Sequence, residues 1–222
     1  MSEGTLYIGH RRYSSWSMRG WLDVMLAGLD VDVEAIRFVR PGPTPGIALV
    51  SPNGLVPFLE HKGARVWESL ALCEYCADIE PSLWPADRIA RAHARSIAAE
   101  MHAGFRGLRQ GMWMNLGRDF SGLGRTPEAL ADIARIEASW AETRQAFGGG
   151  GPFLFGAAFT AADAMYAPVV TRFLTWKPAI TPATRAYCEA VRAHPLVRDW
   201  YDGAALETAD WLVDEYEASP PV

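Results

Sequence analysis

A cluster of hydroxyl side chains, Ser14, Ser15 and Ser17, lies between the strand-like segment 5–9 and a segment with helical periodicity. The apolar residues of that second segment recur at the spacing of one helix face and are Met18, Trp21, Leu22, Met25 and Leu26. Gly28 suits a left-handed helix end. Serine is favoured at helix N-caps, so one interpretation is purely structural. The other is chemical, because a hydroxyl beside the positive end of a helix dipole can donate to a bound thiolate and lower its pKa.

A Val-Pro pair, Val56-Pro57, begins the third strand-like segment and follows the turn-like residues 51–54. Proline is disfavoured inside a strand ladder, so Pro57 marks either an edge strand or a cis peptide bond, and the residues alone favour the common trans form. With a cis bond, the backbone N–H and C=O of Val56 would be free to pair with an extended, peptide-like ligand.

A third pair, Glu68-Ser69, stands at the head of a predicted helix over 70–79. Ser69 is expected to cap this helix. The helix N-terminus suits a carboxylate and Glu68 suits an ammonium group, so together they match the head group of an amino acid. A solvated cap with no ligand is the alternative interpretation.

Four further side chains, His102, Arg106, Arg109 and Trp113, recur at helical spacing. On one continuous helix they would form a polar and aromatic strip that faces a cleft or, alternatively, solvent. The cysteines of Cys73-Glu74-Tyr75-Cys76 fall inside a helix and are predicted to be buried small hydrophobic residues rather than a redox or zinc site. The histidines form no metal motif, so no metal site is expected.

The composition bounds the class of protein. The chain has 222 residues, half of them hydrophobic and 21% charged, which is typical of a globular protein. A net charge of -5 argues against nucleic acid or an anionic membrane surface as a partner. No signal pattern or apolar run long enough for a membrane span is evident, and three cysteines fit a reducing compartment, so we expect a cytoplasmic protein without a disulfide framework.

Strand-like segments occur only in the first third, at 6–9, 31–39, 56–60 and 65–67, with a Pro/Gly-rich loop at 41–46. Everything beyond is helical in pattern. One apolar stripe runs over 97–108 and another over 130–147, ended by the glycines 148–151, and Thr160-Ala161-Ala162-Asp163 has capping-box spacing ahead of an apolar helix. The pattern predicts a small α/β domain over 1–80, a linker over 81–87 and an all-helical domain over 88–222.

These motifs, in this order and along nearly the whole chain, resemble the cytosolic glutathione S-transferase superfamily. The strand–Ser-Ser–helix start, the Val-Pro strand, the Glu-Ser helix start and Phe159-Thr160-Ala161-Ala162-Asp163 carry the resemblance. It implies an α+β thioredoxin-like N-terminal domain that binds glutathione as cosubstrate, followed by an all-α C-terminal domain that shapes a hydrophobic second-substrate pocket. It also implies a homodimer and no metal.

The resemblance assigns roles to single residues. Ser14 is similar to the catalytic serine of the zeta and tau types, with Ser15 as the reserve candidate. Val56, before the family's cis-proline at Pro57, would pair with the cysteinyl unit of glutathione, and Glu68 and Ser69 would hold its γ-glutamyl end. By similarity to beta-type members, His102 is expected at the glutathione site. The residues expected at the second-substrate pocket are Arg106, Arg109, Met112, Trp113 and Trp211.

The leading hypothesis is a glutathione transferase that conjugates the thiolate to a small hydrophobic electrophile in detoxification. Trp16 stands where zeta members carry a cysteine, and Gly54-Leu55 replaces polar residues before Val-Pro, so the alternative of a zeta-type cis–trans isomerase (maleylacetoacetate isomerase) departs from the pattern. A third reading is a non-catalytic binding module of the same fold. No cysteine nucleophile lies near Ser14, which argues against thiol-transferase chemistry.

Overall fold

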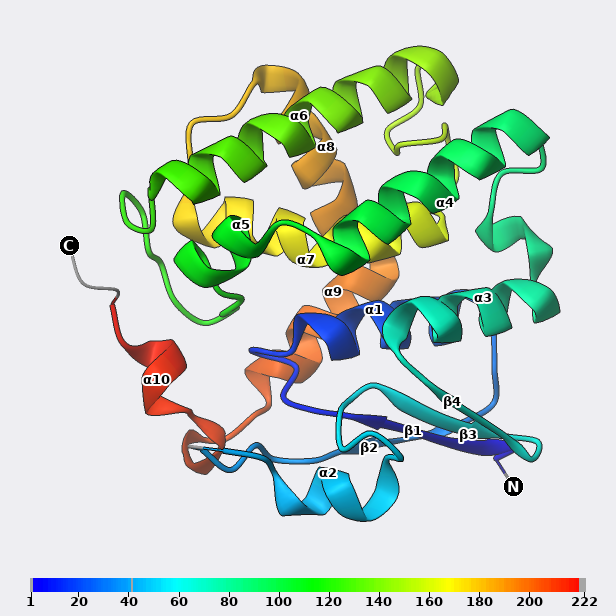
Figure 1. Ribbon diagram of the computed structural model, residues 1–222, viewed down its shortest axis with the longest axis vertical. Helices are drawn as coiled ribbons and strands as arrows, with labels where there is room; N and C mark the ends of the chain where they lie inside the picture. Colours follow the sequence, from blue (N-terminus) through cyan, green and yellow to red (C-terminus); the bar gives the residue numbers. More distant parts are fainter. Residues whose placement is uncertain (1, 41, 220–222) are drawn as a thin grey trace.

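The computed structural model describes residues 2–40 and 42–219. Along the chain, a part that contains a four-stranded sheet precedes a group of helices (Figure 1). The four strands are β1 Gly4–Ile8, β2 Asp32–Ala35, β3 Phe58–His61 and β4 Ala64–Trp67. Their order across the sheet is β2-β1-β3-β4. β1 runs parallel to β2 and antiparallel to β3, and β3 pairs with β4 in antiparallel register. The sheet is therefore mixed, as an α+β domain requires.

Helices cover both faces of this sheet. α1 Ser15–Leu26 and α3 Ser69–Ile79 lie on the face toward the helical part of the molecule, and α2 Pro45–Val50 lies on the other (Figure 1). The alternation of side chains along β1 explains why helices pack on this sheet. Leu6 and Ile8 point to one face and are fully buried, whereas Thr5 and Tyr7 point to the other face and are only partly buried. One face of the strand thus contributes to the core beneath α1 and α3.

The rest of the chain is helical, which confirms the predicted order of an α+β part followed by an all-α part. The helices are α4 Arg88–Ala103, α5 Arg106–Gly111, α6 Pro127–Phe147, α7 Ala161–Trp176, α8 Pro182–Ala193, α9 Pro195–Ala205 and α10 Asp214–Glu217, with short 3₁₀ turns at Pro81–Leu83 and Ala209–Trp211. Nearly every residue of α7 is buried, and it packs against α1, α4 and α8. It joins the two parts of the molecule.

Helix-start and helix-end signals in the sequence have the expected structures. Ser14 is the N-cap of α1, and its Oγ accepts a hydrogen bond from the N–H of Ser17. Gly28 adopts the left-handed conformation just after that helix, with φ of 67°. At the start of α7, the Asp163 carboxylate accepts from the backbone N–H of Thr160 at 2.9 Å, as a capping box requires.

The segment 31–39 is only partly a strand. β2 ends at Ala35. The N–H of Ile36 still donates to the carbonyl oxygen of Ile8, but farther on the N–H of Phe38 donates to Nε2 of His10, and the N–H of Val39 donates to Oγ1 of Thr44. The predicted loop is also shorter than 41–46, since α2 begins at Pro45. Pro41 lies outside the described residues.

The strip from His102 to Trp113 is not on one helix, so that prediction is wrong. α4 ends at Ala103, Phe105 adopts a left-handed conformation with φ of 58°, and α5 begins at Arg106 in a new direction. A Cβ at Gly104 would lie 2.7 Å from the carbonyl oxygen of Glu100, which shows how tightly the chain turns there. The apolar periodicity continues through the break and conceals it.

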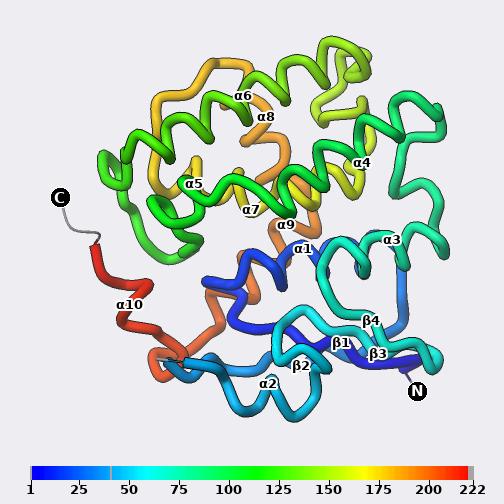
Figure 2. The backbone as a smooth tube through the Cα atoms, viewed as in Figure 1, coloured from blue at the N-terminus to red at the C-terminus, as the bar shows by residue number. Residues whose placement is uncertain are grey.

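After α9 the chain returns to the sheet side of the molecule, where α10 lies close to the loop between β2 and α2 (Figure 2). Side-chain contacts hold α10 against this part of the molecule. Glu217 forms an ion pair with Arg12 at 3.3 Å and accepts a hydrogen bond from the Tyr13 hydroxyl, and Glu215 lies 3.6 Å from Arg40. The end of the described chain therefore covers the region where α1 begins.

Candidate active site

Two neighbouring cavities open at the start of α1. The larger has a volume of about 530 Å³ and the smaller about 190 Å³. They share three residues, Trp16, Leu55 and Val56, in their walls. The shared residues place the two cavities next to each other at the start of α1.

Ser14 and Ser15 line the larger cavity, where both side chains are almost buried. Ser14 Oγ lies 2.8 Å from Ser17 Oγ, and Ser17 Oγ in turn accepts a hydrogen bond from the backbone N–H of Gly9 at 2.9 Å. A chain of polar groups therefore runs from the end of β1 to the cavity wall at the positive end of the α1 dipole. This arrangement suits an anion or a thiolate next to Ser14.

The smaller cavity contains Val56, Pro57, Glu68 and Ser69, so the fold brings two of the predicted motifs together. The bond between Val56 and Pro57 is cis, the form that the family resemblance implies and that the residues alone did not favour. Glu68, not Ser69, occupies the N-cap position of α3, with φ of 69°, and Ser69 is the first residue of the helix. The prediction that Ser69 is the cap is therefore wrong.

Because Glu68 is the N-cap of α3, the Ser69 side chain has no capping role. Its Oγ is fully buried and has no hydrogen-bond partner within the described part of the chain, although it lines the smaller cavity. Glu68 keeps its carboxylate partly exposed and accepts a hydrogen bond from Asn53 Nδ2 at 3.2 Å. A polar ligand in the smaller cavity would meet an unpaired hydroxyl, a carboxylate and the first turn of a helix.

His102 lies near this group but lines neither cavity. Its Nε2 is 3.8 Å from a Glu68 oxygen, and its ring meets the edge of the Trp16 ring at 5.2 Å between centroids. Burial lowers the pKa of His102 and outweighs the opposite effect of Glu68. The neutral form of His102 therefore prevails at neutral pH. His102 contacts Trp16 and Glu68 without lining either cavity.

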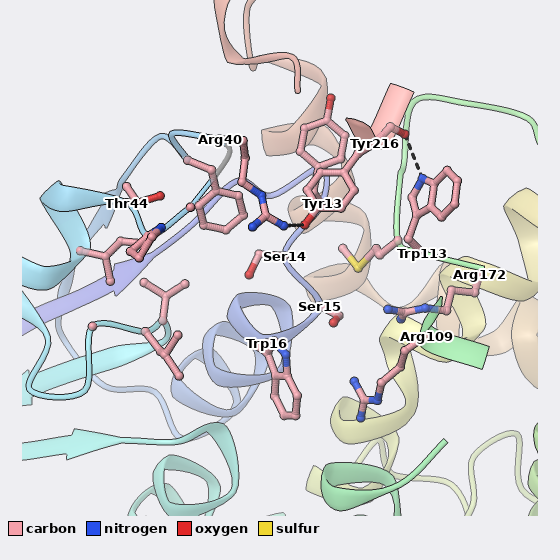
Figure 3. Close-up of a pocket in the computed structure, with 18 residues that line it drawn as sticks. Tyr13, Ser14, Ser15, Trp16, Arg40, Thr44, Arg109, Trp113, Arg172 and Tyr216 are labelled. Carbon is pink, nitrogen blue, oxygen red and sulfur yellow. Dashed lines mark hydrogen bonds between the residues drawn. The ribbon is translucent and has the colours of Figure 1, made fainter. Parts of the chain in front are cut away.

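The helical part of the molecule supplies the far wall of the larger cavity. Arg109 comes from α5, Trp113 follows that helix, Arg172 comes from the middle of α7 and Tyr216 from α10. Figure 3 shows the guanidinium groups of Arg109 and Arg172 directed toward Ser15 and Trp16. The wall combines aromatic surface with positive charge.

Sequence reasoning placed some residues here and missed others. Of the residues predicted for the second-substrate pocket, Arg109 and Trp113 line the larger cavity, whereas exposed Arg106, buried Met112 and Trp211 line neither cavity. The cavity residues that the sequence did not point to are Tyr13, Arg40, Thr44, Met114, Arg172 and Tyr216. Arg172 had a usable signal in the sequence, because a single arginine inside an otherwise apolar helix is unusual and marks a functional candidate.

Within 2–40 and 42–219, no three His, Cys, Asp or Glu side chains gather in a way that would hold a metal ion. No helix in that same part of the chain combines the length and apolarity needed to cross a bilayer. All three cysteines are buried and unpaired, and burial raises the pKa of both Cys73 and Cys76.

Family models match both parts of the chain. The glutathione S-transferase N-terminal domain matches residues 13–79, and the glutathione S-transferase C-terminal domain matches residues 91–203. The chain therefore belongs to the glutathione S-transferase family.

One curated relative, a probable maleylacetoacetate isomerase from Caenorhabditis elegans, is 30% identical over 105 residues. That match covers 46% of this chain and 48% of the relative, so it spans only about half of the relative's length. It gives no assignment of substrate by itself.

Solved structures share the fold along most of the chain. A glutathione transferase homologue from a Burkholderia species, with bound glutathione, has a TM-score of 0.69 at 22% identity and covers 91% of this chain and 98% of its own. A tau-class enzyme from mango, Mangifera indica, has a TM-score of 0.68 at 19% identity and covers 97% of each chain. A theta-class enzyme from Xanthomonas axonopodis pv. citri, with glutathione bound, has a TM-score of 0.65 at 21% identity and covers 94% and 99%.

Proposed function

We propose that the protein is a glutathione transferase that conjugates the glutathione thiolate to a small electrophile. One observation carries the proposal: Ser14 lines a cavity that shares Trp16, Leu55 and Val56 with a second cavity lined by Glu68 and Ser69. Glutathione laid along this path would place its γ-glutamyl ammonium near Glu68, its γ-glutamyl carboxylate at Ser69 and its thiol at Ser14.

The protein's contribution to catalysis would be orientation and ionisation of the thiol. The thiolate attacks an electrophilic carbon held in the larger cavity, and the carbon–sulfur bond forms as the leaving group departs or the double bond accepts the electron pair. Ser14, the free N–H groups of the first α1 turn and the helix dipole all stabilise the negative sulfur. No protein nucleophile is required.

The hydroxyl pair at Ser14 and Ser17 suggests how the donor is prepared. Gly9 donates its N–H to Ser17 Oγ, and the Ser14 hydroxyl donates to the same oxygen at 2.8 Å. This bond holds the Ser14 hydroxyl at the cavity wall, and its proton would turn from Ser17 to the thiolate when glutathione binds. Ser17 would then be a positioning residue that acts through Ser14.

Ser14→Ala tests the proposal. Loss of a charge-assisted hydrogen bond of about 1.5–3 kcal/mol should raise the pKa of bound glutathione by about 1–2 units and lower turnover at neutral pH. The thiolate absorbance of the binary complex, followed against pH, measures this directly. Ser15→Ala is the matched control, and an unchanged profile in Ser14→Ala with a shifted one in Ser15→Ala would transfer the role to Ser15.

A glutathione-dependent cis–trans isomerase is the second candidate, and the partial similarity to the probable maleylacetoacetate isomerase favours it. Stoichiometry separates the two activities, because a transferase consumes one glutathione per product while an isomerase regenerates it. Glutathione binding without turnover of either kind of substrate would instead indicate a binding module.

We further propose a cytoplasmic homodimer with a role in detoxification. Three buried, unpaired cysteines are compatible with a reducing compartment. Large apolar side chains are exposed on three packed elements, namely Trp67 on β4, Ile79 on α3 and Ile89 on α4. Sedimentation velocity of the wild type and of Ile89→Asp tests the dimer: a monomeric wild type refutes it, and dissociation by the substitution would locate the interface.

A further inference from the structure

The wall of the larger cavity that faces Ser15 contains a cluster of arginines without carboxylate partners. Arg109 and Arg172 line the cavity, and Arg19 lies behind Trp16, fully buried. None of the three forms an ion pair with a carboxylate among the described residues. Asp23 and Asp132 act on Arg19 and Arg109 from beyond ion-pair distance, whereas no carboxylate of the described residues offsets the burial of Arg172. Burying a positive charge without a paired counter-charge is costly, so the site favours a ligand that supplies one.

Backbone carbonyls hold both cavity arginines in fixed orientations. Arg172 donates from Nε to the carbonyl oxygen of Met112 and from Nη1 to that of Pro168, each at 2.8 Å. Arg109 donates from Nε to the carbonyl oxygen of Gly104 at 3.0 Å and from Nη2 to that of Met101. Each guanidinium group keeps one further amino group, Nη2 of Arg172 and Nη1 of Arg109, without a recorded partner in the described structure.

The third arginine increases the positive potential. Nε of Arg19 donates to the carbonyl oxygen of Met165 at 2.8 Å, while both its Nη atoms are buried without partners in the described structure. Trp16 contacts two of these cations, since the guanidinium carbons of Arg19 and Arg109 lie 4.9 and 4.7 Å from its ring centre. These cation–π contacts offset part of the cost, but no ring contact of this kind is recorded for Arg172.

The arginine cluster lies away from the path proposed for glutathione. Figure 3 shows Arg40 and Thr44 on one side of Ser14, and Arg109 and Arg172 on the other, beyond Ser15. A glutathione molecule that runs from Glu68 past Val56 brings its thiol to this region from the smaller cavity, so the arginines face the space left for the acceptor. Burial and the neighbouring Arg109 lower the pKa of Arg172 to about 9, which leaves it charged at neutral pH.

We infer that the electrophile conjugated at this site carries a carboxylate, bound by Arg109 and Arg172 with Arg19 behind them. Two donors from fixed guanidinium groups suit the two oxygens of a carboxylate, and Trp16 and Trp113 provide an apolar wall for the remainder of the molecule. This inference rests on the proposed function and narrows its substrate from a neutral hydrophobic electrophile to an anionic one.

The test compares 4-chloro-3,5-dinitrobenzoate with its methyl ester. In both, the thiolate forms a carbon–sulfur bond at the ring carbon, and chloride leaves with the electrons of the carbon–chlorine bond. Rates are divided by the uncatalysed rates with glutathione, which removes the difference in intrinsic reactivity. Wild-type enzyme should favour the acid. Arg172→Gln and Arg109→Gln should each lower kcat/KM for the acid by about tenfold to hundredfold and change the ester by less than about threefold.

Controls address stability and the glutathione site. Arg172→Lys, which keeps the charge without the fork, should retain more acid activity than Arg172→Gln, and circular dichroism verifies folding of each variant. Arg185→Gln, an exposed arginine on α8, is the matched control. The KM for glutathione should stay unchanged in all variants. A rise in that KM equal to the loss with the acid would assign the arginines to glutathione and overturn the inference.

A binding experiment keeps the inference independent of turnover. Calorimetric titration with benzoate and with benzamide should show preference for benzoate in the wild type, and loss of that preference in Arg172→Gln. Benzoate should compete with the electrophile and not with glutathione. If benzoate binds selectively while no electrophile reacts, the proposed function fails and the anion site stands. Equal, weak binding of benzoate and benzamide, or preference for the ester by the wild type, refutes the anion site.

Discussion

Asp163 is the residue whose replacement should reveal most about how the helices of the all-α part hold together. It is fully buried at the first turn of α7, and its carboxylate accepts four hydrogen bonds. Oδ2 accepts from the N–H and the hydroxyl of Thr160, both at 2.9 Å, and Oδ1 accepts from the N–H of Leu154 at 3.1 Å and the hydroxyl of Tyr187 at 3.0 Å. Asp163→Asn changes this arrangement with almost no change of volume.

The expected cost follows from the donors. The amide nitrogen of asparagine cannot accept a hydrogen bond, and the hydroxyls of Thr160 and Tyr187 can rotate to accept from it, whereas backbone N–H groups cannot. Whichever oxygen is replaced, one buried backbone N–H loses its acceptor, which costs about 1–3 kcal/mol. The remaining bonds change from charge-assisted to neutral and weaken by roughly half, while the penalty for burying the charge disappears. We therefore expect Asp163→Asn to lower the free energy of unfolding by about 2–4 kcal/mol.

Urea unfolding and thermal scans provide the assay. Asp163→Ala, which removes both acceptor oxygens and all four hydrogen bonds, should be the least stable variant, Asp163→Asn should be intermediate, and Tyr187→Phe, which removes one hydroxyl, should be the mildest. Asp78→Asn on the exposed side of α3 is the matched control and should be within about 0.5 kcal/mol of the wild type. The reasoning is refuted if Asp163→Asn is as stable as that control, or if Tyr187→Phe costs more than Asp163→Ala.

Three further predictions concern the site's supports. Burial lowers the pKa of His10 to about 4, so the unfolded chain binds a proton below about pH 6.5 that the folded protein does not, and stability should fall between pH 6.5 and 4 by up to about 3 kcal/mol, measured by urea midpoints. Ser17→Ala should raise the pKa of bound glutathione by less than Ser14→Ala does, measured by thiolate absorbance. Gly20→Ala places a Cβ 2.6 Å from Cγ of Pro57 and should raise the KM for glutathione several-fold, measured by steady-state kinetics.

Each of these has a clear contrary result. For His10, the His10→Gln variant should show a shallower dependence of stability on pH, and an identical slope would exclude His10 as its source. For Ser17, a shift as large as that in Ser14→Ala would mean that Ser17 itself donates to the thiolate. For Gly20, the KM for the electrophile should stay constant, and an equal rise in both KM values would indicate general disruption of the fold.

Local interactions explain why several elements were predictable. A helix cap involves residues three apart, so Ser14 and the Thr160–Asp163 box were recognisable from their neighbours alone. The long helix α6 follows its apolar periodicity and ends where the glycines begin, with Gly148 at its C-cap. The order of strands and helices similarly defined the α+β part and the all-α part, because periodicity records which face of each element is buried.

Prediction failed where distant residues decide the local backbone. Beyond Ile36 the segment leaves the sheet, and the N–H of Phe38 donates to the ring of His10, 28 residues away in sequence. The strip from His102 to Trp113 divides between two helices at left-handed Phe105, which a period of apolar residues cannot show. In both places the sequence pattern fits the predicted element as well as it fits the element that the structure contains.

Short motifs at element boundaries pointed to the family, to the order of its two parts and to Ser14, Val56, Glu68 and Ser69 as candidate site residues, because each motif is local. The tertiary structure brings the cavities at Glu68 and Ser14 next to each other, and it brings Arg172 of α7 to the same cavity as Ser14, more than 150 residues away in the chain. Convergence of this kind depends on how α7 packs against α1 and on where α5 and α10 lie around the cavity at the start of that helix. Packing is set by many non-local contacts at once, so no spacing along the chain records it.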